Sequence, residues 1–277
     1  MPFEMSGHMK AVIIGDSVYV GGGYQPTVLV YMLHTGSWRM LPHYKYDWCG
    51  MAAVNNQLVL VGGAKINKAI NVLGVWNDES GMWTHPFPVL PTPRCEVYVT
   101  SYHKWLIVAG GRDDINGPNK IEVEILDTSS RQWYKAAPLP SSCAGLSSTI
   151  NGNMWYLADT HVHSVCLDEL ISQAVSQSAG ATSPSTPSPW QTLPDTPLNH
   201  STVLVLNGAL LAVGGWKSSA INLYQPSNSR WVNVGDLPTE RLRCACLVLP
   251  SGEIFVAGGC RGPYNTVTNF VDIATII

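Results

Sequence analysis

The sequence predicts an all-β protein built from six copies of one unit, each made of four short strands. Short apolar runs recur along the chain and five of them end in a double glycine, as in "SVYVGG" and "LLAVGG". The runs alternate apolar and polar residues and are separated by Gly, Pro, Asn and Ser, which favours strands over helices. A proline and a tryptophan recur at regular distances from the glycines, so the repeat extends over the whole chain.

The distance from proline to glycine is nearly constant. The prolines are Pro2, Pro42, Pro91, Pro140, Pro194 and Pro238. The first positions of the glycine motifs are Gly21, Gly62, Gly110, the degenerate Ala158, Gly214 and Gly258. The six gaps are 19, 20, 19, 18, 20 and 20 residues. We expect the first strand to follow the proline and the second to end at the glycines, which let backbones approach closely.

A tryptophan marks the fourth strand of five units. These residues are Trp38, Trp83, Trp133, Trp190 and Trp231. A large apolar residue stands seven positions before four of them, at Tyr31, Trp76, Leu126 and Tyr224. We expect the tryptophans to fill the wedges between neighbouring sheets.

This combination of double glycine, Tyr-type residue and tryptophan resembles the kelch repeat. The resemblance implies a single domain over residues 1–277, a six-bladed kelch-type β-propeller with four-stranded antiparallel blades around a central channel. Phe270 occupies the last Tyr-type position, so the matching tryptophan would fall at Ile277, while Met1-Pro2 matches Leu193-Pro194 at the end of a fourth strand. We therefore expect the N-terminal segment to join the last blade and close the ring, and the domain to be part of a longer protein.

One segment of the fourth unit departs from the repeat. "LDELISQAVSQ" predicts a short amphipathic helix, and the Ser/Pro/Thr-rich residues 178–189 predict a disordered insertion. A tolerated surface insertion is the favoured interpretation, and a docking or phosphorylation loop with Ser183 and Thr186 before prolines is the alternative. Strand parity puts this insertion on the face that carries the connections between strands one and two.

Composition excludes several function classes. Charged residues make up 13% of the chain, the net charge is −3, and no basic run is present, so we expect no nucleic-acid partner. No apolar stretch reaches the length of a membrane helix, and the N-terminus lacks a signal-peptide pattern. The seven cysteines without C-x-x-C pairs indicate reduced thiols in a cytoplasmic protein. We expect the isolated domain to be a monomer.

The resemblance implies a binding face formed by the residues entering each first strand and by the loops after the double glycines. Counting back about 14 residues from each first glycine gives His8, Trp48, Glu96, His200 and Arg243, with Ala144 in the fourth unit. The loops after the glycines add Arg112, His161, Trp216, Arg261 and Tyr264 as predicted ligand-binding residues, with Tyr24, Asp113, His163 and Lys217 nearby. Kelch-type adaptors often place several arginines at the entry positions to bind an acidic peptide. The mixed set in this chain departs from that pattern.

The stretch "YLADTHVHS" raises a separate question, because Asp159, His161 and His163 have the spacing of metal ligands. The repeat register shows that Ala158-Asp159 replace a double glycine, so a degenerate repeat explains the motif, and we predict neither a metal nor any other cofactor. Cys49, Cys95, Cys143 and Cys244 also recur near the strand-one entries. They are interpreted as small apolar fillers, with a redox sensor as the alternative.

Three classes of function remain. The first is a protein- or peptide-binding scaffold or adaptor, including a substrate receptor of a ubiquitin ligase. The second is a carbohydrate-active kelch enzyme, either a sugar oxidase or a mutarotase, although no catalytic motif is present and a non-enzyme is predicted. The third is a cytoskeletal cross-linker. The first is the preferred prediction, with Trp48, Trp216 and Arg243 as its main anchors.

Overall fold

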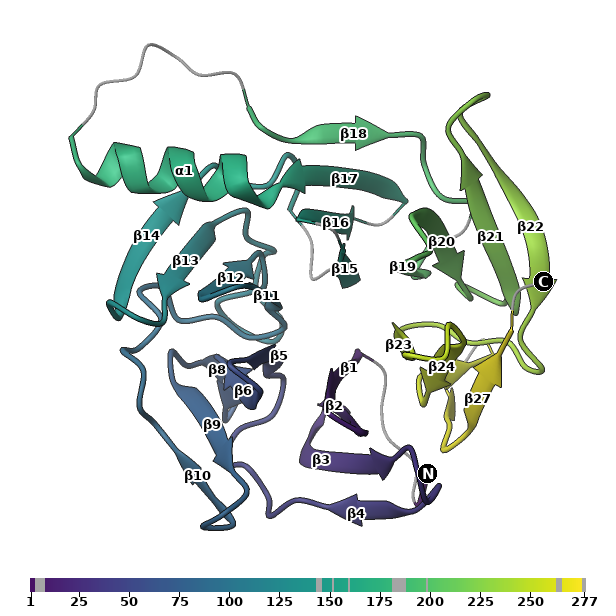
Figure 1. The fold of residues 1–277 in the computed structure, drawn as a ribbon, viewed down its shortest axis with the longest axis horizontal. Helices are drawn as coiled ribbons and strands as arrows, with labels where there is room; N and C mark the ends of the chain where they lie inside the picture. The colour runs from purple at the N-terminus through teal and green to yellow at the C-terminus, as the bar shows by residue number, and fades with distance from the viewer. Residues whose placement is uncertain are drawn as a thin grey trace.

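The computed structural model shows a β-propeller whose sheets are arranged around a common centre (Figure 1). It describes residues 1–2, 8–142, 146–150, 152–158, 160–180, 188–197, 199–262 and 266–275. The predicted all-β propeller with antiparallel four-stranded blades is confirmed for five sheets. Within the described residues the last sheet has three strands.

The first three blades follow the predicted strand order from the centre outwards. Blade 1 contains β1 (Met9–Ile14), β2 (Ser17–Gly22), β3 (Gln25–Met32) and β4 (Trp38–Met40). Blade 2 contains β5 (Gly50–Val54), β6 (Gln57–Val61), β9 (Leu73–Asn77) and β10 (Met82–Thr84), with the small ribbon β7 (Ala64–Lys65) and β8 (Lys68–Ala69). Blade 3 contains β11 (Tyr98–Tyr102), β12 (Trp105–Ala109), β13 (Val123–Asp127) and β14 (Gln132–Ala136).

The remaining sheets complete the chain. Blade 4 contains β15 (Leu146–Ile150), β16 (Asn153–Ala158), β17 (His161–Cys166) and β18 (Gln191–Leu193), with helix α1 (Leu167–Ser178) inserted before β18. Blade 5 contains β19 (Thr202–Leu206), β20 (Ala209–Val213), β21 (Ala220–Gln225) and β22 (Arg230–Asp236). The last sheet contains β23 (Ala245–Val248), β24 (Ile254–Ala257) and β27 (Val271–Ala274), beside the ribbon β25 (Cys260–Arg261) and β26 (Thr266–Val267).

In four blades a large apolar residue stands seven positions before the tryptophan, and this spacing is the length of a hairpin. Tyr31 pairs directly with Trp38 across β3 and β4, and Leu126 pairs with Trp133 across β13 and β14. The equivalent pairs in blades 2 and 5 are Trp76 with Trp83 and Tyr224 with Trp231. Cross-strand aromatic pairs stabilise the outer hairpin of a sheet.

Each later tryptophan also holds the preceding blade. The indole Nε1 of Trp83 donates to the Pro42 carbonyl at 2.8 Å, and that of Trp231 donates to the Pro194 carbonyl at 3.2 Å. Trp133 and Trp190 do the same to carbonyls of the preceding segment, at 3.4 and 3.3 Å. The predicted role of these residues between neighbouring sheets is therefore correct.

The double glycines allow the close approach that the sequence predicts. Gly62 has φ of +61°, and a Cβ there would lie 2.2 Å from the Arg94 carbonyl oxygen. Gly214 has the same relation to Arg241, with φ of +65° and a distance of 2.2 Å. A side chain at either position would collide with the backbone of the next blade, so glycine is required there.

Two buried arginines that the sequence analysis missed lie beside these glycines. Arg94 Nη2 lies 2.5 Å from Glu124 Oε2, and its Nη1 donates to the Gly110 and Glu122 carbonyls. Arg241 repeats the pattern with Asp272 at 2.5 Å. Both arginine side chains are fully buried. Each arginine therefore fixes the entry to the first strand of its sheet.

The insertion of the fourth unit is more than a surface addition. Leu167, Leu170, Ile171 and Ala174 of α1 are buried in one cluster with Ile107 and Ile125 of blade 3. Ser178 is the last residue of α1 and Pro189 is buried, so both ends of the segment 178–189 are ordered. Ser183 and Thr186 lie outside the described residues.

The N-terminus lies near the last sheet. The Met1 ammonium group donates to the Asn269 carbonyl at 2.8 Å. Strand β1 packs against β23, and Met9 of β1 lies in one buried cluster with Ala245 of β23 and Phe255 of β24. The described residues 1–2 form no strand, so the predicted N-terminal contribution to the last blade is not tested beyond this contact. No helix in the described part of the chain has the length and apolar character to cross a membrane.

Candidate functional site

The five predicted entry residues occupy the same unusual backbone conformation. His8, Trp48, Glu96, His200 and Arg243 have φ of 65°, 57°, 52°, 63° and 54°. A left-handed conformation is uncommon for residues other than glycine, so its recurrence shows that these positions are structurally equivalent. Ala144 and Cys143, at the equivalent place in blade 4, lie outside the described residues.

Backbone hydrogen bonds connect these positions from blade to blade. The Glu96 N–H donates to the Trp48 carbonyl at 2.9 Å, and the Arg243 N–H donates to the His200 carbonyl at 3.3 Å. The N–H of Met9, next to His8, donates to the Arg243 carbonyl at 3.3 Å. We call His8, Trp48, Glu96, His200 and Arg243 the entry ring. It surrounds one end of the central channel.

Below the entry ring lies the channel itself, a cavity of about 340 Å³. It is lined by the innermost strands, with Lys10 near the entry ring and Thr100, Thr202, Cys244 and Cys246 along the wall. Lys10 crosses the channel toward blade 3, where its Nζ lies 5.9 Å from the centre of the Tyr98 ring.

Positive charge dominates the surroundings of His8. Burial lowers the pKa of His8 well below its ordinary value, and the charges of Arg243, Lys10 and Arg112 lower it further. Burial also raises the pKa of Glu96, although the same three cations act in the opposite direction. Lys10 was not predicted as a site residue, because its position two residues after an entry residue gives no signal in the repeat pattern.

The Glu96 carboxylate is nearly enclosed. Its side chain is 5% exposed, and Oε2 lies 3.3 Å from Arg112 Nε, a distance and geometry that make an ion pair but no hydrogen bond. Arg112 Nε instead donates to Asn119 Oδ1 at 2.9 Å. The structure therefore brings Glu96 and Arg112 together as part of one charged cluster.

Trp48 is placed differently from the prediction of an exposed anchor. It is only 6% exposed, and its ring packs edge-on against Tyr24 at 4.1 Å and against His8 at 5.5 Å between ring centres. Tyr24 is 59% exposed and covers it. The exposed aromatic residue of this part of the face is therefore Tyr24.

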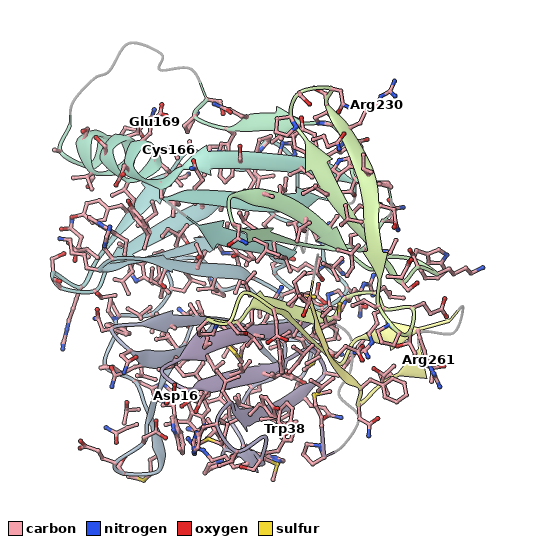
Figure 2. The ribbon with its side chains drawn as sticks, turned by 45° about the vertical axis from the view of Figure 1, so that its right-hand side comes forward. Asp16, Trp38, Cys166, Glu169, Arg230 and Arg261 are labelled. Atoms are coloured by element: carbon pink, nitrogen blue, oxygen red, sulfur yellow. The ribbon has the colours of Figure 1, made fainter. Side chains whose placement is uncertain are left out.

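Trp216 is exposed, as predicted, with 40% of its surface accessible. Its N–H donates to the Asn199 carbonyl at 2.9 Å, which holds the loop beside His200. Arg261 is also exposed, and its guanidinium lies 5.5 Å from the centre of the Phe270 ring. Figure 2 shows Arg261 on the segment that follows β24. Tyr264 lies outside the described residues.

His161 and His163 make separate hydrogen bonds. His161 Nδ1 lies 2.6 Å from Asp195 Oδ1, whereas His163 bonds Thr192 through Nδ1 at 2.9 Å and Ser141 through Nε2 at 3.0 Å. Both ring nitrogens of His163 are thus engaged with hydroxyl groups, and burial lowers its pKa. Asp159 lies outside the described residues, and no group of three metal-ligating side chains occurs among the residues that are described.

Two of the cysteines predicted near the entry positions, Cys49 and Cys95, are buried. Burial raises the pKa of the Cys49 thiol, and it raises that of Cys95 to about 12. Both side chains pack among residues of the entry segments, as expected of small apolar fillers.

The fold is a β-propeller, and the comparisons support its resemblance to kelch-like proteins. Kelch-like protein 23 from Pongo abelii is 22% identical over 264 residues, covering 91% of this chain and 45% of that protein. Kelch-like protein 36 from Mus musculus is 24% identical over 289 residues, covering 91% and 44%. Kelch-like protein 25 from Xenopus tropicalis is 28% identical over 179 residues, covering 61% and 30%. The chain thus spans less than half the length of these relatives.

The fold also matches a solved structure. That of YjhT has a TM-score of 0.79 and 14% sequence identity, and the match covers 99% of this chain and 95% of the other. No protein-family model matches the chain.

Proposed function

We propose that the chain is a protein- or peptide-binding module that uses the face around the entry ring. The observation that carries this proposal is the set of five equivalent left-handed positions. Backbone hydrogen bonds join Trp48 to Glu96, and they join His200 to Arg243 and Arg243 to the residue after His8. A constant backbone presents four kinds of side chain from five blades, because two of the five residues are histidines. This arrangement lets a rigid scaffold carry a variable binding surface.

The charges of this face favour a partner with an acidic group. Arg243, Lys10 and Arg112 all act on His8, and Glu96 is the one carboxylate in the entry ring. Charge complementarity at a partly buried site increases specificity and association rate. This cationic character comes partly from Lys10 and Arg112, which do not occupy entry positions.

Tyr24 and Trp216 provide aromatic surface for the same partner. They are 59% and 40% exposed and flank the entry ring on the loops after β2 and β20. Exposed aromatic residues beside arginine are typical of the residues that dominate binding energy. We therefore replace Trp48 by Tyr24 in the set of proposed anchors, which becomes Tyr24, Trp216 and Arg243.

The wider role follows the kelch-like relatives. We infer an adaptor or scaffold without catalytic activity, acting in the cytoplasm, and a ubiquitin-ligase substrate receptor is one form of that role. Six blades, with the segment around Met1 completing the sheet of β27, are part of the same proposal. The contact of Met1 with Asn269 supports that closure.

Selection from a displayed random-peptide library tests the proposal. Wild-type protein should enrich peptides that contain acidic residues, and the variant Tyr24→Ala/Trp216→Ala/Arg243→Ala should fail to bind them. A second variant, Asp16→Ala/Glu79→Ala/Arg131→Ala, changes exposed residues at the opposite ends of the strands and should bind as wild type does. Absence of any enriched peptide, or equal binding by both variants, would contradict the proposal.

A further inference from the structure

A pair of thiols lies in the wall of the channel, directly after the entry residue Arg243. Cys246 is in β23 and Cys244 directly precedes that strand, so the two side chains point to the same side of the extended chain. Their Sγ atoms are 3.5 Å apart, and both residues line the cavity of about 340 Å³. Among the described cysteines, they are the pair whose sulfur atoms are in contact.

The neighbourhood of Cys244 stabilises a thiolate. A hydrogen bond from the Cys246 thiol lowers the pKa of Cys244, with further contributions from the Thr202 hydroxyl and the charge of Arg241, while burial opposes them. Thr202 Oγ1 lies 3.8 Å from the Cys244 Sγ. Burial and the neighbouring Cys244 raise the pKa of Cys246 well above its ordinary value. Cys244 is therefore the sulfur of the pair that loses its proton more readily.

Cys246 is half-buried and Cys244 is buried behind it, so only a small molecule in the channel could reach this pair, and the pair is poor as a metal site. The channel has room for water-sized reagents, whereas a protein oxidant would have to enter a cavity of about 340 Å³. A tetrahedral zinc site needs four ligands, and no cluster of three His, Cys, Asp or Glu is found in the described parts of the chain. Two sulfur atoms are too few to hold zinc, but they are enough to form a disulfide bond.

We propose that Cys244 and Cys246 form a reversible dithiol–disulfide couple that is oxidised by a small peroxide entering the channel. The Cys244 thiolate attacks one peroxide oxygen, the O–O bond breaks, and the other oxygen leaves as water or an alcohol after taking up a proton. The resulting sulfenic acid is attacked by the Cys246 sulfur, so the S–S bond forms and water leaves. The two sulfurs lose two electrons in total, and the peroxide gains them.

Strand geometry predicts that this disulfide is easily reduced. Residues two apart on a strand have Cα atoms about 6.6 Å apart, near the upper end of the range of about 4.4–6.8 Å that disulfides span. A bond formed at this limit is strained, and strained disulfides are the labile ones that thiol reductants open readily. The modification is therefore expected to reverse on return to reducing conditions.

The test counts thiols after treatment of the reduced protein with limiting hydrogen peroxide. Alkylation in denaturant should label seven cysteines before oxidation and five after it, a loss of two. Tryptic cleavage after Arg243 and Arg261 releases a peptide with Cys244, Cys246 and Cys260. That peptide should be lighter by two hydrogen atoms and should carry one alkyl group, on Cys260. Dithiothreitol should restore all three labelling sites.

Variants identify the partners in the bond. Cys244→Ser and Cys246→Ser should each abolish the loss of two thiols, whereas Cys260→Ser and Cys166→Ser should leave it unchanged. Cys166 is exposed at the start of α1, where Figure 2 shows it, and it serves as the control for general oxidation. Full alkylation of Cys244 and Cys246 in wild type after Cys166 has been oxidised would overturn the proposal. Loss of the bond in Cys260→Ser would also overturn it. The wild-type peptide map decides the question even if a serine variant fails to fold.

Discussion

The backbone N–H of Glu96 donates to the carbonyl of Trp48, 2.9 Å away, and so joins blades 2 and 3 directly at the end of the channel. The two residues share the left-handed conformation, yet they have opposite chemistry. Trp48 is packed under Tyr24, whereas Glu96 carries a nearly enclosed carboxylate beside Arg112. The same backbone position therefore serves packing in one blade and charge in the next.

Replacing Trp48 should destabilise the fold. Because its side chain is 6% exposed and contacts both Tyr24 and His8, we expect Trp48→Ala to lower the free energy of unfolding. The expected loss is about 3 kcal/mol, as for other large-to-small changes of buried aromatic residues. Urea denaturation measures it. Trp216→Ala, at an exposed position, should cost less than about 0.5 kcal/mol, and a larger loss there than at Trp48 would contradict the assignment of the two residues.

The buried arginines should be essential for stability. We expect Arg94→Met to destabilise the protein by about 3–5 kcal/mol, because it leaves the buried Glu124 carboxylate without its cationic partner. Arg94→Met/Glu124→Leu should recover part of that loss, since no unpaired charge remains. The exposed pair Arg39–Asp78, at 3.0 Å, provides the control, and Arg39→Met should change stability by less than about 1 kcal/mol. Equal effects of Arg94→Met and Arg39→Met in chemical denaturation would refute this.

Helix α1 should contribute to the core of blade 3. Leu170 is fully buried against that blade, so Leu170→Ala should cost about 2–5 kcal/mol. Ser172 is on the exposed side of the same helix, and Ser172→Ala should be neutral within about 0.5 kcal/mol. Thermal unfolding of both variants measures the difference. A neutral Leu170→Ala would restore the interpretation of this segment as a tolerated addition.

Protonation of His8 should destabilise the protein on acidification. Its folded pKa is lowered below the ordinary value of 6.5, so the unfolded chain binds this proton more readily. The stability contributed by neutral His8 is complete above pH 6.5 and is lost as the pH falls toward the lowered folded pKa. The raised pKa of Glu96 has the opposite effect, because protonation of Glu96 on acidification favours the folded state. This contribution is the same in wild type and in a His8 variant, so it cancels when the two are compared.

We therefore expect His8→Asn to reduce the fall in melting temperature between about pH 7.5 and about pH 5.5. His34→Asn, on the exposed connection between β3 and β4, should show the full wild-type fall. Parallel melting curves for wild type and His8→Asn across this range would show that His8 does not titrate as described.

Much of the scaffold could be predicted because the repeat is a direct consequence of local geometry. The seven positions between Tyr31 and Trp38 are the length of a hairpin. Glycine is needed at position 62 because any side chain there would collide with the Arg94 carbonyl. Both constraints act within one unit or between adjacent units, so they recur in the sequence.

The site was less predictable because it depends on contacts between blades. Whether Trp48 is exposed depends on how Tyr24 folds over it, and no sequence spacing encodes that packing. The influence of Lys10 on Glu96 likewise crosses from blade 1 to blade 3. Arg94 and Arg241 stand two residues before entry positions, but arginine occupies this position in two units only, so it is not part of the repeat pattern.

The central claim is that partners bind around the entry ring, and the dissociation constant of a peptide selected by wild-type protein tests it most directly. Calorimetry should show at least about a 30-fold weaker affinity for Tyr24→Ala/Trp216→Ala/Arg243→Ala, since the loss of a single anchor worth about 2 kcal/mol already has that effect. The opposite-face variant Asp16→Ala/Glu79→Ala/Arg131→Ala should bind with the wild-type affinity. Unchanged affinity in the first variant, with a melting temperature equal to that of wild type, would contradict the claim.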